Sequence, residues 1–251
     1  MRVAALADIH GNLPALEAVL REVERESPDL IVFGGDVVSG PMPSETLALL
    51  MGMQRARFVR GNADRGVVDA FDGKPKAEMS GPFAEWCAKQ ITSEQRDFLA
   101  SFETTVTMDD VDEVGRVLFC HGSPRSDIEI MTAETSIDRM HVFMTGLDVD
   151  LVVCGHTHMQ FDREVDSIRV INAGSVGMPY GTPGAYWTLL GPGVRPRRTD
   201  YDRAAAASRL RAVGAPEAEE FVRDNVLEVP SVEEAMDFMR RAEAKQTRPV
   251  T

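Results

Sequence analysis

The sequence has few cysteines and aromatic residues and no long hydrophobic stretch. Its 251 residues include three cysteines, Cys87, Cys120 and Cys154, an odd number without a C-x-x-C pair, so we expect small buried hydrophobic residues and no disulfide framework. The longest apolar runs, such as Val3–Ala7, reach about five residues, whereas a membrane span needs about 20. The first run is also too short for the core of a signal peptide. We therefore expect a cytoplasmic protein with no membrane partner.

Positive charge is also scarce. There are 27 Lys and Arg residues against 40 Asp and Glu residues, which gives a formal net charge of −13. An acidic surface repels polyanions, which disfavours nucleic acid and anionic membranes as partners. A small phosphorylated substrate, such as a nucleotide, is compatible with this acidic surface where a metal ion supplies local positive charge. The sequence leaves the oligomeric state open.

Apolar runs alternate with amphipathic segments in the first 60 residues. Strand-like runs at Val3–Ala7, Leu30–Phe33 and Arg57–Arg60 are separated by two helix-like segments, the second of which we expect Ser44 to cap. This βαβαβ order predicts a parallel sheet with helices on its faces. Further strand patterns between residues 104 and 190 predict a second, partly antiparallel sheet. We expect the two sheets to pack face to face, in an α/β fold with helices outside.

The composition changes near residue 200, where Ala, Glu and Arg become frequent and strand patterns end. We therefore divide the chain into a core, residues 1–200, and a C-terminal helical appendage, residues 201–251. A capping box, Ser231-Val-Glu-Glu234, is expected to open the last helix. The appendage is either a lid over the functional site or a purely packing element.

Metal-binding residue types follow the strand-like runs. Because strand ends of a parallel sheet gather at one edge, we expect these side chains to converge there. The candidates are Asp8, His10, Asp36, Asn62, His121, His156 and His158. The one remaining histidine, His141, falls in a helical pattern, and we interpret it as structural or exposed to solvent.

The spacing of these residues favours two metal ions. In extended backbone, residues two apart project to the same side, so Asp8-x-His10 and His156-x-His158 could each face one cavity. Nearby glycines, including Gly61 and Gly155, keep backbone bulk away. Seven donors exceed what one ion needs, whereas two ions sharing one carboxylate would use them all. Each motif alone is compatible with a purely structural role, but their combination is not expected by chance.

Five motifs in this order resemble the calcineurin-like metallophosphoesterase superfamily. They are Asp8-Ile-His10-Gly-Asn12, Gly34-Gly-Asp36, Gly61-Asn62, His121-Gly122 and Gly155-His156-Thr-His158. The later Asn172-Ala-Gly-Ser-Val-Gly177 is similar to the small bacterial and archaeal phosphodiesterase branch. The resemblance implies a four-layer α/β/β/α sandwich of two mixed sheets, in agreement with the strand patterns.

The resemblance also implies roles for these residues. One metal ion would take Asp8, His10, Asp36 and His158, and the other Asp36, Asn62, His121 and His156, with a metal-bridging hydroxide as the nucleophile. Asp36, Asn62 and His121 are accordingly the predicted catalytic residues. Nitrogen and oxygen ligands without thiolate suit several divalent ions, of which manganese is the expected one and iron, nickel, cobalt and zinc are alternatives.

One position departs from the family pattern. Many members carry a histidine after the metal-binding asparagine, where it contacts phosphate and protonates the leaving group, but here the residue is Ala63. Loss of a general acid costs roughly 10²–10⁴-fold for a poor leaving group. Ala63 therefore favours substrates with good leaving groups. Arg65 and Asn12 are candidate substrate contacts. Arg65 could instead pair with Asp64 or Asp69, and Asn12 could cap the following helix, either instead of contacting substrate or in addition to it.

The sequence thus predicts a dinuclear metal-dependent phosphoesterase that hydrolyses phosphodiester or nucleotide phosphoanhydride bonds, with diadenosine-polyphosphate-like substrates among the candidates. One alternative is a small-molecule phosphomonoesterase. Another is a non-catalytic metal-binding scaffold protein, which would be expected to have lost ligands, whereas all seven are present.

Overall fold

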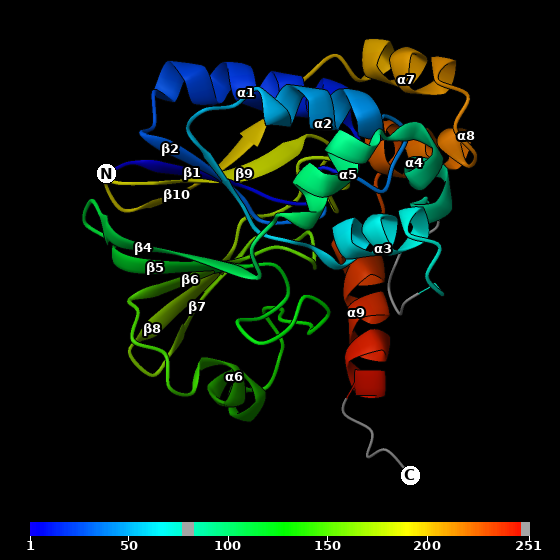
Figure 1. Cartoon of the computed structure of the whole chain (residues 1–251). Coiled ribbons are helices and arrows are strands. Elements are labelled where there is room, and N and C mark those ends of the chain that lie inside the picture. Colours follow the sequence, from blue (N-terminus) through cyan, green and yellow to red (C-terminus); the bar gives the residue numbers. More distant parts are fainter. Residues whose placement is uncertain (77–82, 247–251) are drawn as a thin grey trace.

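A computed structural model of the chain describes residues 1–76 and 83–246. Two mixed sheets pack face to face, and helices lie on their outer faces (Figure 1). The predicted four-layer α/β/β/α arrangement is confirmed.

The first sheet has the strand order β10-β9-β1-β2-β3. Its strands are β1 (Val3–Leu6), β2 (Leu30–Phe33), β3 (Ala56–Phe58), β9 (Ala185–Leu190) and β10 (Val194–Thr199). Strands β1, β2 and β3 run parallel, as the βαβαβ pattern predicts, whereas β9 and β10 are antiparallel to their neighbours. The parallel strands therefore end at one edge of the sheet.

The second sheet has the order β4-β5-β6-β8-β7. Its strands are β4 (Thr105–Val111), β5 (Gly115–Cys120), β6 (Leu151–Cys154), β7 (Phe161–Val165) and β8 (Ile168–Asn172). Strands β5, β6 and β8 are parallel, and antiparallel β4 and β7 lie at the two edges. This sheet is partly antiparallel, as predicted.

The alternation of side chains along β1 shows how the layers are held together. Val3 and Ala5 pack between the sheets with Phe119 of β5 and Val153 of β6. Their neighbours in β1 face the helices on the other side, because successive strand residues point in opposite directions. A strand that is buried on both faces must be apolar throughout, which explains the uninterrupted run in the sequence.

The helices before residue 200 cover the outer faces of the sheets. They are α1 (Leu13–Glu26), α2 (Pro43–Met51), α3 (Asn62–Phe71), α4 (Ala84–Gln90), α5 (Ser93–Ala100) and α6 (Ile137–Met144). The prediction that Ser44 caps α2 is wrong. The helix starts at Pro43, with Met42 in the cap position, and a proline suits the first helical position because its missing N–H needs no partner.

Two elements have no counterpart among the predictions. Strand β10 has the sequence VRPRRT, which contains no apolar run, and it forms at the edge of the sheet, where a proline is tolerated. Helix α3 begins at Asn62 itself, so this predicted metal ligand occupies the first turn of a helix and not an irregular loop.

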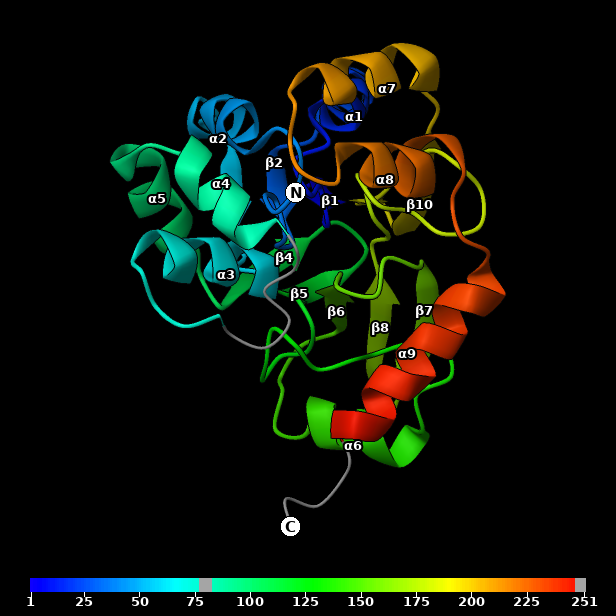
Figure 2. The same cartoon turned by 90° about the vertical axis from the view of Figure 1, so that its right-hand side faces the viewer.

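After residue 200 the described chain is helical. The elements are α7 (Arg203–Ala212), α8 (Ala218–Val222), a π-helical turn (Arg223–Leu227) and α9 (Val232–Gln246). Leu210 and Phe221 join the same hydrophobic core as α1 and α2. Helix α9 extends from the α8 region toward α6 (Figure 2), where Arg240 pairs with Glu134 at 2.8 Å. The division at residue 200 stays a prediction.

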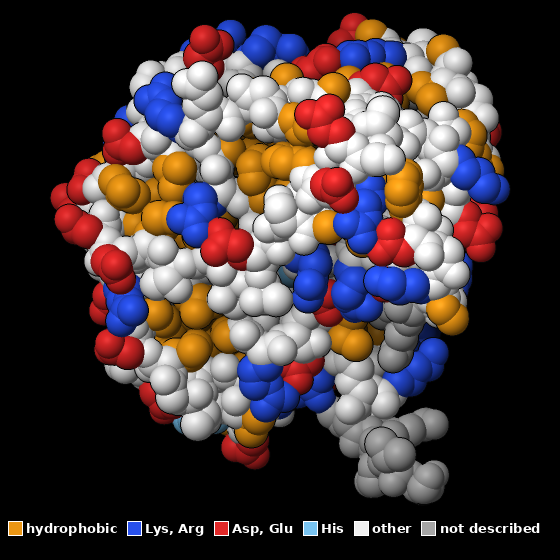
Figure 3. Space-filling model, in the orientation of Figure 1, with side chains coloured by type: hydrophobic (Ala, Val, Ile, Leu, Met, Phe, Trp, Pro, Cys, Tyr) orange, Lys and Arg blue, Asp and Glu red, His pale blue; other side chains and the backbone are white. Residues whose placement is uncertain are grey.

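Within the described residues, no helix combines the length and the apolar character needed to cross a membrane. On the face drawn in Figure 3, basic and acidic side chains are mixed, and basic ones gather over the region of α3.

Candidate metal centre

The predicted ligands converge where the parallel strands of both sheets end. Two groups have ligand atoms within 4.8 Å of one another, namely Asp8 with His10 and His158, and Asp36 with His121 and His156. Asn62 joins the second group, with its Oδ1 3.1 Å from His121 Nε2. All seven side chains are buried or nearly so. The structure therefore assembles one polar centre from four loops and the first turn of α3.

Asp36 connects the two groups. Its Oδ2 lies 3.3 Å from His121 Nε2 and 3.7 Å from His10 Nε2, so this one oxygen faces a histidine of each group. The first group is equally compact, because His158 Nε2 lies 3.3 Å from His10 Nε2 and 3.4 Å from Asp8 Oδ1. Such spacing between lone-pair donors suits shared cations better than direct contacts between the side chains.

The backbone that carries these ligands is not extended, contrary to expectation. Left-handed φ values occur at five of the ligands: Asp8 (55°), His10 (48°), Asp36 (52°), His156 (66°) and His158 (61°). Such conformations cost about 1–3 kcal/mol each in residues other than glycine and cluster at functional sites. The paired ligands of D-x-H and H-x-H therefore meet through tight turns after the strands, and not through strand alternation.

Two of the predicted glycines allow close approach to the carboxylates. A Cβ atom on Gly61 would lie 2.0 Å from Asp36 Oδ1, and one on Gly155 would lie 2.7 Å from Asp8 Oδ2. Both distances are far below van der Waals contact. These positions accept only glycine without moving a ligand.

Backbone carbonyls orient two of the imidazoles. His121 Nδ1 lies 2.8 Å from the Gly34 carbonyl oxygen, and His158 Nδ1 lies 2.8 Å from the Met178 carbonyl oxygen. A carbonyl can only accept, so each Nδ1 carries a proton and each Nε2 is the ring nitrogen directed at the centre, where it can bind a metal ion once it is deprotonated. Ser175, from the late glycine-rich motif, donates to the Asp8 carbonyl at 2.8 Å and steadies that turn.

Charges within the centre shift the pKa values of its histidines. Burial by itself lowers the pKa of His121, but the charge of Asp36 and a hydrogen bond to it raise the value to about 10. For His156, burial and the neighbouring His121 lower the pKa to about 4. In return, contact with the His121 ring outweighs burial and holds the pKa of Asp36 well below its usual range. The carboxylate of Asp36 therefore stays ionised at neutral pH.

Asp64 is a buried residue of this centre that the sequence motifs do not identify as functional. Its Oδ2 accepts the backbone N–H groups of Asp36 (2.8 Å) and Gly61 (3.0 Å), and its Oδ1 accepts those of Val37 (2.9 Å) and Val38 (3.2 Å). One carboxylate therefore fastens the Asp36 turn to the start of α3. Burial and the charge of Asp36 raise the pKa of Asp64 to about 7.

The two predicted substrate contacts, Asn12 and Arg65, both bind other protein groups in the structure. Asn12 is fully buried, and its amide caps α1 through the Ala15 N–H (3.3 Å) while it donates to the Gly177 carbonyl (3.0 Å). Its amide thus holds the fold together, and a substrate contact of Asn12 stays a prediction. Arg65 pairs with neither Asp64 nor Asp69, but its side chain makes a two-pronged ion pair with Asp127 at 2.8 and 3.0 Å.

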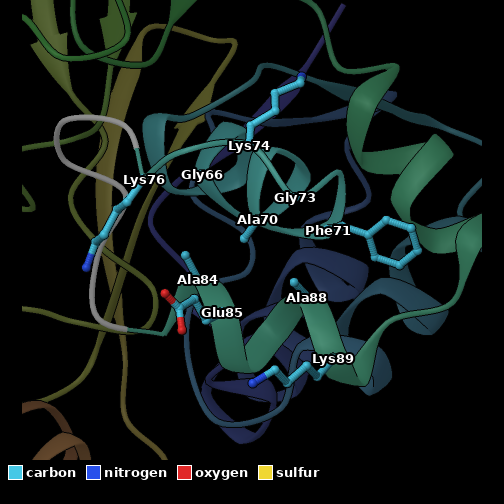
Figure 4. Close-up of a pocket in the computed structure, with 10 residues that line it drawn as sticks. All are labelled: Gly66, Ala70, Phe71, Gly73, Lys74, Lys76, Ala84, Glu85, Ala88 and Lys89. Carbon is cyan, nitrogen blue, oxygen red and sulfur yellow. The ribbon is translucent and has the colours of Figure 1, made fainter.

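Two cavities lie near α3, and only one of them is lined by a predicted ligand. The larger, about 620 Å³, lies between α3 and α4 (Figure 4) and is lined by none of the predicted ligands. Lys74 at its margin is already paired with Asp69 at 3.0 Å. The smaller, about 270 Å³, is lined by His121 together with residues of the following loop. The smaller cavity is therefore the one that adjoins the candidate centre.

Comparison with known proteins identifies the family of this chain. The sequence profile described as the calcineurin-like phosphoesterase superfamily domain matches residues 1–190. The uncharacterized protein MJ0912 of Methanocaldococcus jannaschii is 29% identical over 198 residues, which cover 70% of this chain and 76% of that protein.

Two solved structures share the fold. The metallophosphoesterase from Sphaerobacter thermophilus is 28% identical with a TM-score of 0.69, over 88% of this chain and 96% of that one. The hypothetical protein PH1004 from Pyrococcus horikoshii OT3 has a TM-score of 0.74 at 19% identity, over 92% of this chain and 99% of that one. The match in fold thus extends beyond residue 190 into the helices of the C-terminal region.

Proposed function

Because the chain belongs to the calcineurin-like phosphoesterase superfamily and is a phosphoester hydrolase by class, we propose that it cleaves phosphodiester or nucleotide phosphoanhydride bonds at the centre around Asp36. The observation that carries the proposal is the position of Asp36 Oδ2, which faces His121 at 3.3 Å and His10 at 3.7 Å. A single carboxylate between two ligand groups is what a pair of metal ions requires.

We assign the ligands in two sets that share Asp36. The first set adds Asp8, His10 and His158, and the second adds Asn62, His121 and His156. The imidazole, carboxylate and amide donors fit first-row divalent ions, and we propose manganese, with iron, nickel, cobalt or zinc as alternatives. Two such ions, when bound, lower the pKa of a water molecule and neutralise charge on a phosphoryl group.

The protein residues set the geometry for this chemistry. Gly34 and Met178 carbonyls fix the rings of His121 and His158, so the Nε2 atoms stay directed at the centre. Asp36 Oδ1 accepts the Ala63 N–H at 2.8 Å, which leaves its Oδ2 to face both histidine groups. Preorganised ligands avoid reorganisation when charge develops in the transition state.

The proposed substrates have good leaving groups. Ala63 replaces the histidine that many relatives use as an acid, and its side chain is buried. Four of the five histidines are proposed ligands, and His141 pairs with Asp166 at 3.0 Å on the outer helix α6. No imidazole is therefore left to protonate an alkoxide. Nucleoside phosphates leave without such help, so we propose nucleotide-derived substrates, and we retain the cytoplasm as the expected location.

The test compares three substrates on metal-stripped protein reloaded with Mn²⁺. We expect hydrolysis of bis(p-nitrophenyl) phosphate and of a dinucleoside polyphosphate, and much slower hydrolysis of glycerol phosphate. Equal rates on glycerol phosphate would instead support a small-molecule phosphomonoesterase. Failure to turn over any phosphorylated compound in a fully loaded sample would refute the proposal and support a metal-binding scaffold.

A further inference from the structure

The cavity beside His121 contains an arginine that the proposed chemistry has not used. Arg60 lines this cavity of about 270 Å³ together with Arg125 and Asp127. His121 belongs both to the cavity wall and to the second ligand group. His121 is therefore the residue that joins the cavity to the candidate centre.

Arg60 has unused hydrogen-bonding capacity. Its Nε is buried and has no hydrogen-bond partner among the described residues. Its Nε makes only a long ion pair with Asp127 Oδ2, at 4.0 Å and beyond hydrogen-bond distance, because Asp127 is already hydrogen-bonded by Arg65. The Arg60 side chain is 35% exposed, so a ligand can reach its guanidinium, and the unpartnered Nε can gain an acceptor when a ligand binds.

The other charged groups of the cavity are matched. Arg125 pairs with Glu129, and Arg65 pairs with Asp127, so the Arg60 guanidinium supplies the positive charge in excess. This excess is local, on a chain whose formal net charge is −13. The cavity therefore selects for an anion while the rest of the surface repels one.

We propose that Arg60 binds a second phosphoryl group, adjacent to the one that reacts. The inference rests on the proposed function and narrows its substrate class to compounds with at least two linked phosphoryl groups. Neighbouring phosphoryl groups share one oxygen, so the second must sit directly beside the metal centre. A planar guanidinium with parallel N–H donors matches two phosphoryl oxygens.

The size of the cavity agrees with this ligand. A water molecule occupies about 30 Å³, so about 270 Å³ holds a phosphoryl group with its solvent. It falls below the roughly 300–1,000 Å³ of pockets that enclose drug-sized ligands. The nucleoside part of a substrate would therefore lie outside the cavity, which makes the number of linked phosphoryl groups the feature that Arg60 recognises.

Calorimetric binding of two non-hydrolysable probes tests the proposal on Mn²⁺-loaded protein. Methylenediphosphonate has two linked phosphonate groups, and methylphosphonate has one. We expect Arg60→Gln to weaken methylenediphosphonate binding about 10- to 100-fold and methylphosphonate binding less than about 3-fold. Arg57→Gln is the matched control, because it removes the same charge from an exposed residue paired with Glu103, and it should leave both affinities unchanged.

Two results would overturn the proposal. One is an unchanged affinity of Arg60→Gln for methylenediphosphonate, and the other is an equal loss for both probes, which would indicate a general disturbance of the centre. If Arg60→Gln does not fold, Arg60→Lys provides the same comparison. Lysine keeps the positive charge but lacks the parallel N–H donors of a guanidinium, so we expect weaker binding of methylenediphosphonate only. Wild-type hydrolysis of bis(p-nitrophenyl) phosphate tests the proposed function separately, because that substrate has only one phosphoryl group.

Discussion

Replacing Asp64 by asparagine should destabilise the protein and the candidate centre together. At pH 8, above its pKa of about 7, Asp64 is ionised, and its two oxygens accept four backbone N–H groups. Asparagine retains one oxygen, which can still serve Val37 and Val38. Its amide NH₂ would then face the N–H groups of Asp36 and Gly61, donor against donor.

The magnitude follows from those two lost bonds. A buried N–H without an acceptor costs about 1–3 kcal/mol, so two of them predict a loss of about 2–6 kcal/mol. A typical domain has a total stability of about 5–15 kcal/mol, so the change is large. Because the affected groups position Asp36 and the segment that carries Asn62, we expect Mn²⁺ affinity to fall by about 10–100-fold as well.

Urea unfolding at pH 8 and Mn²⁺ titration measure the two effects. Asp69→Asn is the matched control on the same helix, since it removes the same charge from a pair with Lys74 and should cost less than about 1 kcal/mol. If Asp64→Asn unfolds at the same urea concentration as Asp69→Asn and binds Mn²⁺ as tightly as wild type, the proposed positioning role of Asp64 is incorrect.

Three further predictions concern two of the ligands and a glycine that lies against Asp36. Asp36→Asn should lower turnover of bis(p-nitrophenyl) phosphate by more than about 100-fold with little change in circular dichroism, and near-normal turnover would contradict the shared ligand. Gly61→Ala should weaken Mn²⁺ binding more than about 10-fold in a titration, because the added Cβ would overlap Asp36 Oδ1 at 2.0 Å, whereas Gly52→Ala, with only ordinary contacts, should not. The pKa of His121 is raised from 6.5 to about 10 in the metal-free protein, so the stability it contributes is present below pH 6.5 and lost as pH rises through 10. Urea midpoints of the metal-free protein should therefore fall between pH 7 and 10, with His158, whose pKa is also raised, acting in the same direction, and a midpoint that rises over this range would refute the assignment.

The parts of the fold with strong apolar patterning could be predicted from the sequence. Strands such as β1 and β2 are uninterrupted apolar runs. The candidate ligands follow the ends of parallel strands in both sheets, and these ends meet at one side of the molecule. Strand β10 could not be predicted in the same way. Its sequence, VRPRRT, has no apolar run, and the strand is held at the sheet edge by backbone pairing with β9.

The local geometry of the centre could not be predicted from the sequence for a different reason. The spacing of Asp8-x-His10 suggested extended backbone, but left-handed turns at both residues bring the side chains together. Asp64 and Arg60 lie close to Asn62 in sequence, yet their roles depend on distant partners, the Asp36 turn and the loop after His121. Such partners become visible only when the chain is folded.

The central claim is that two cations share the carboxylate of Asp36. Anomalous X-ray diffraction from crystals soaked in Mn²⁺ tests it directly. Two peaks about 3.5–4 Å apart, with Asp36 between them, are the predicted result. A single peak at full occupancy, or two peaks of which neither lies next to Asp36, would contradict the account.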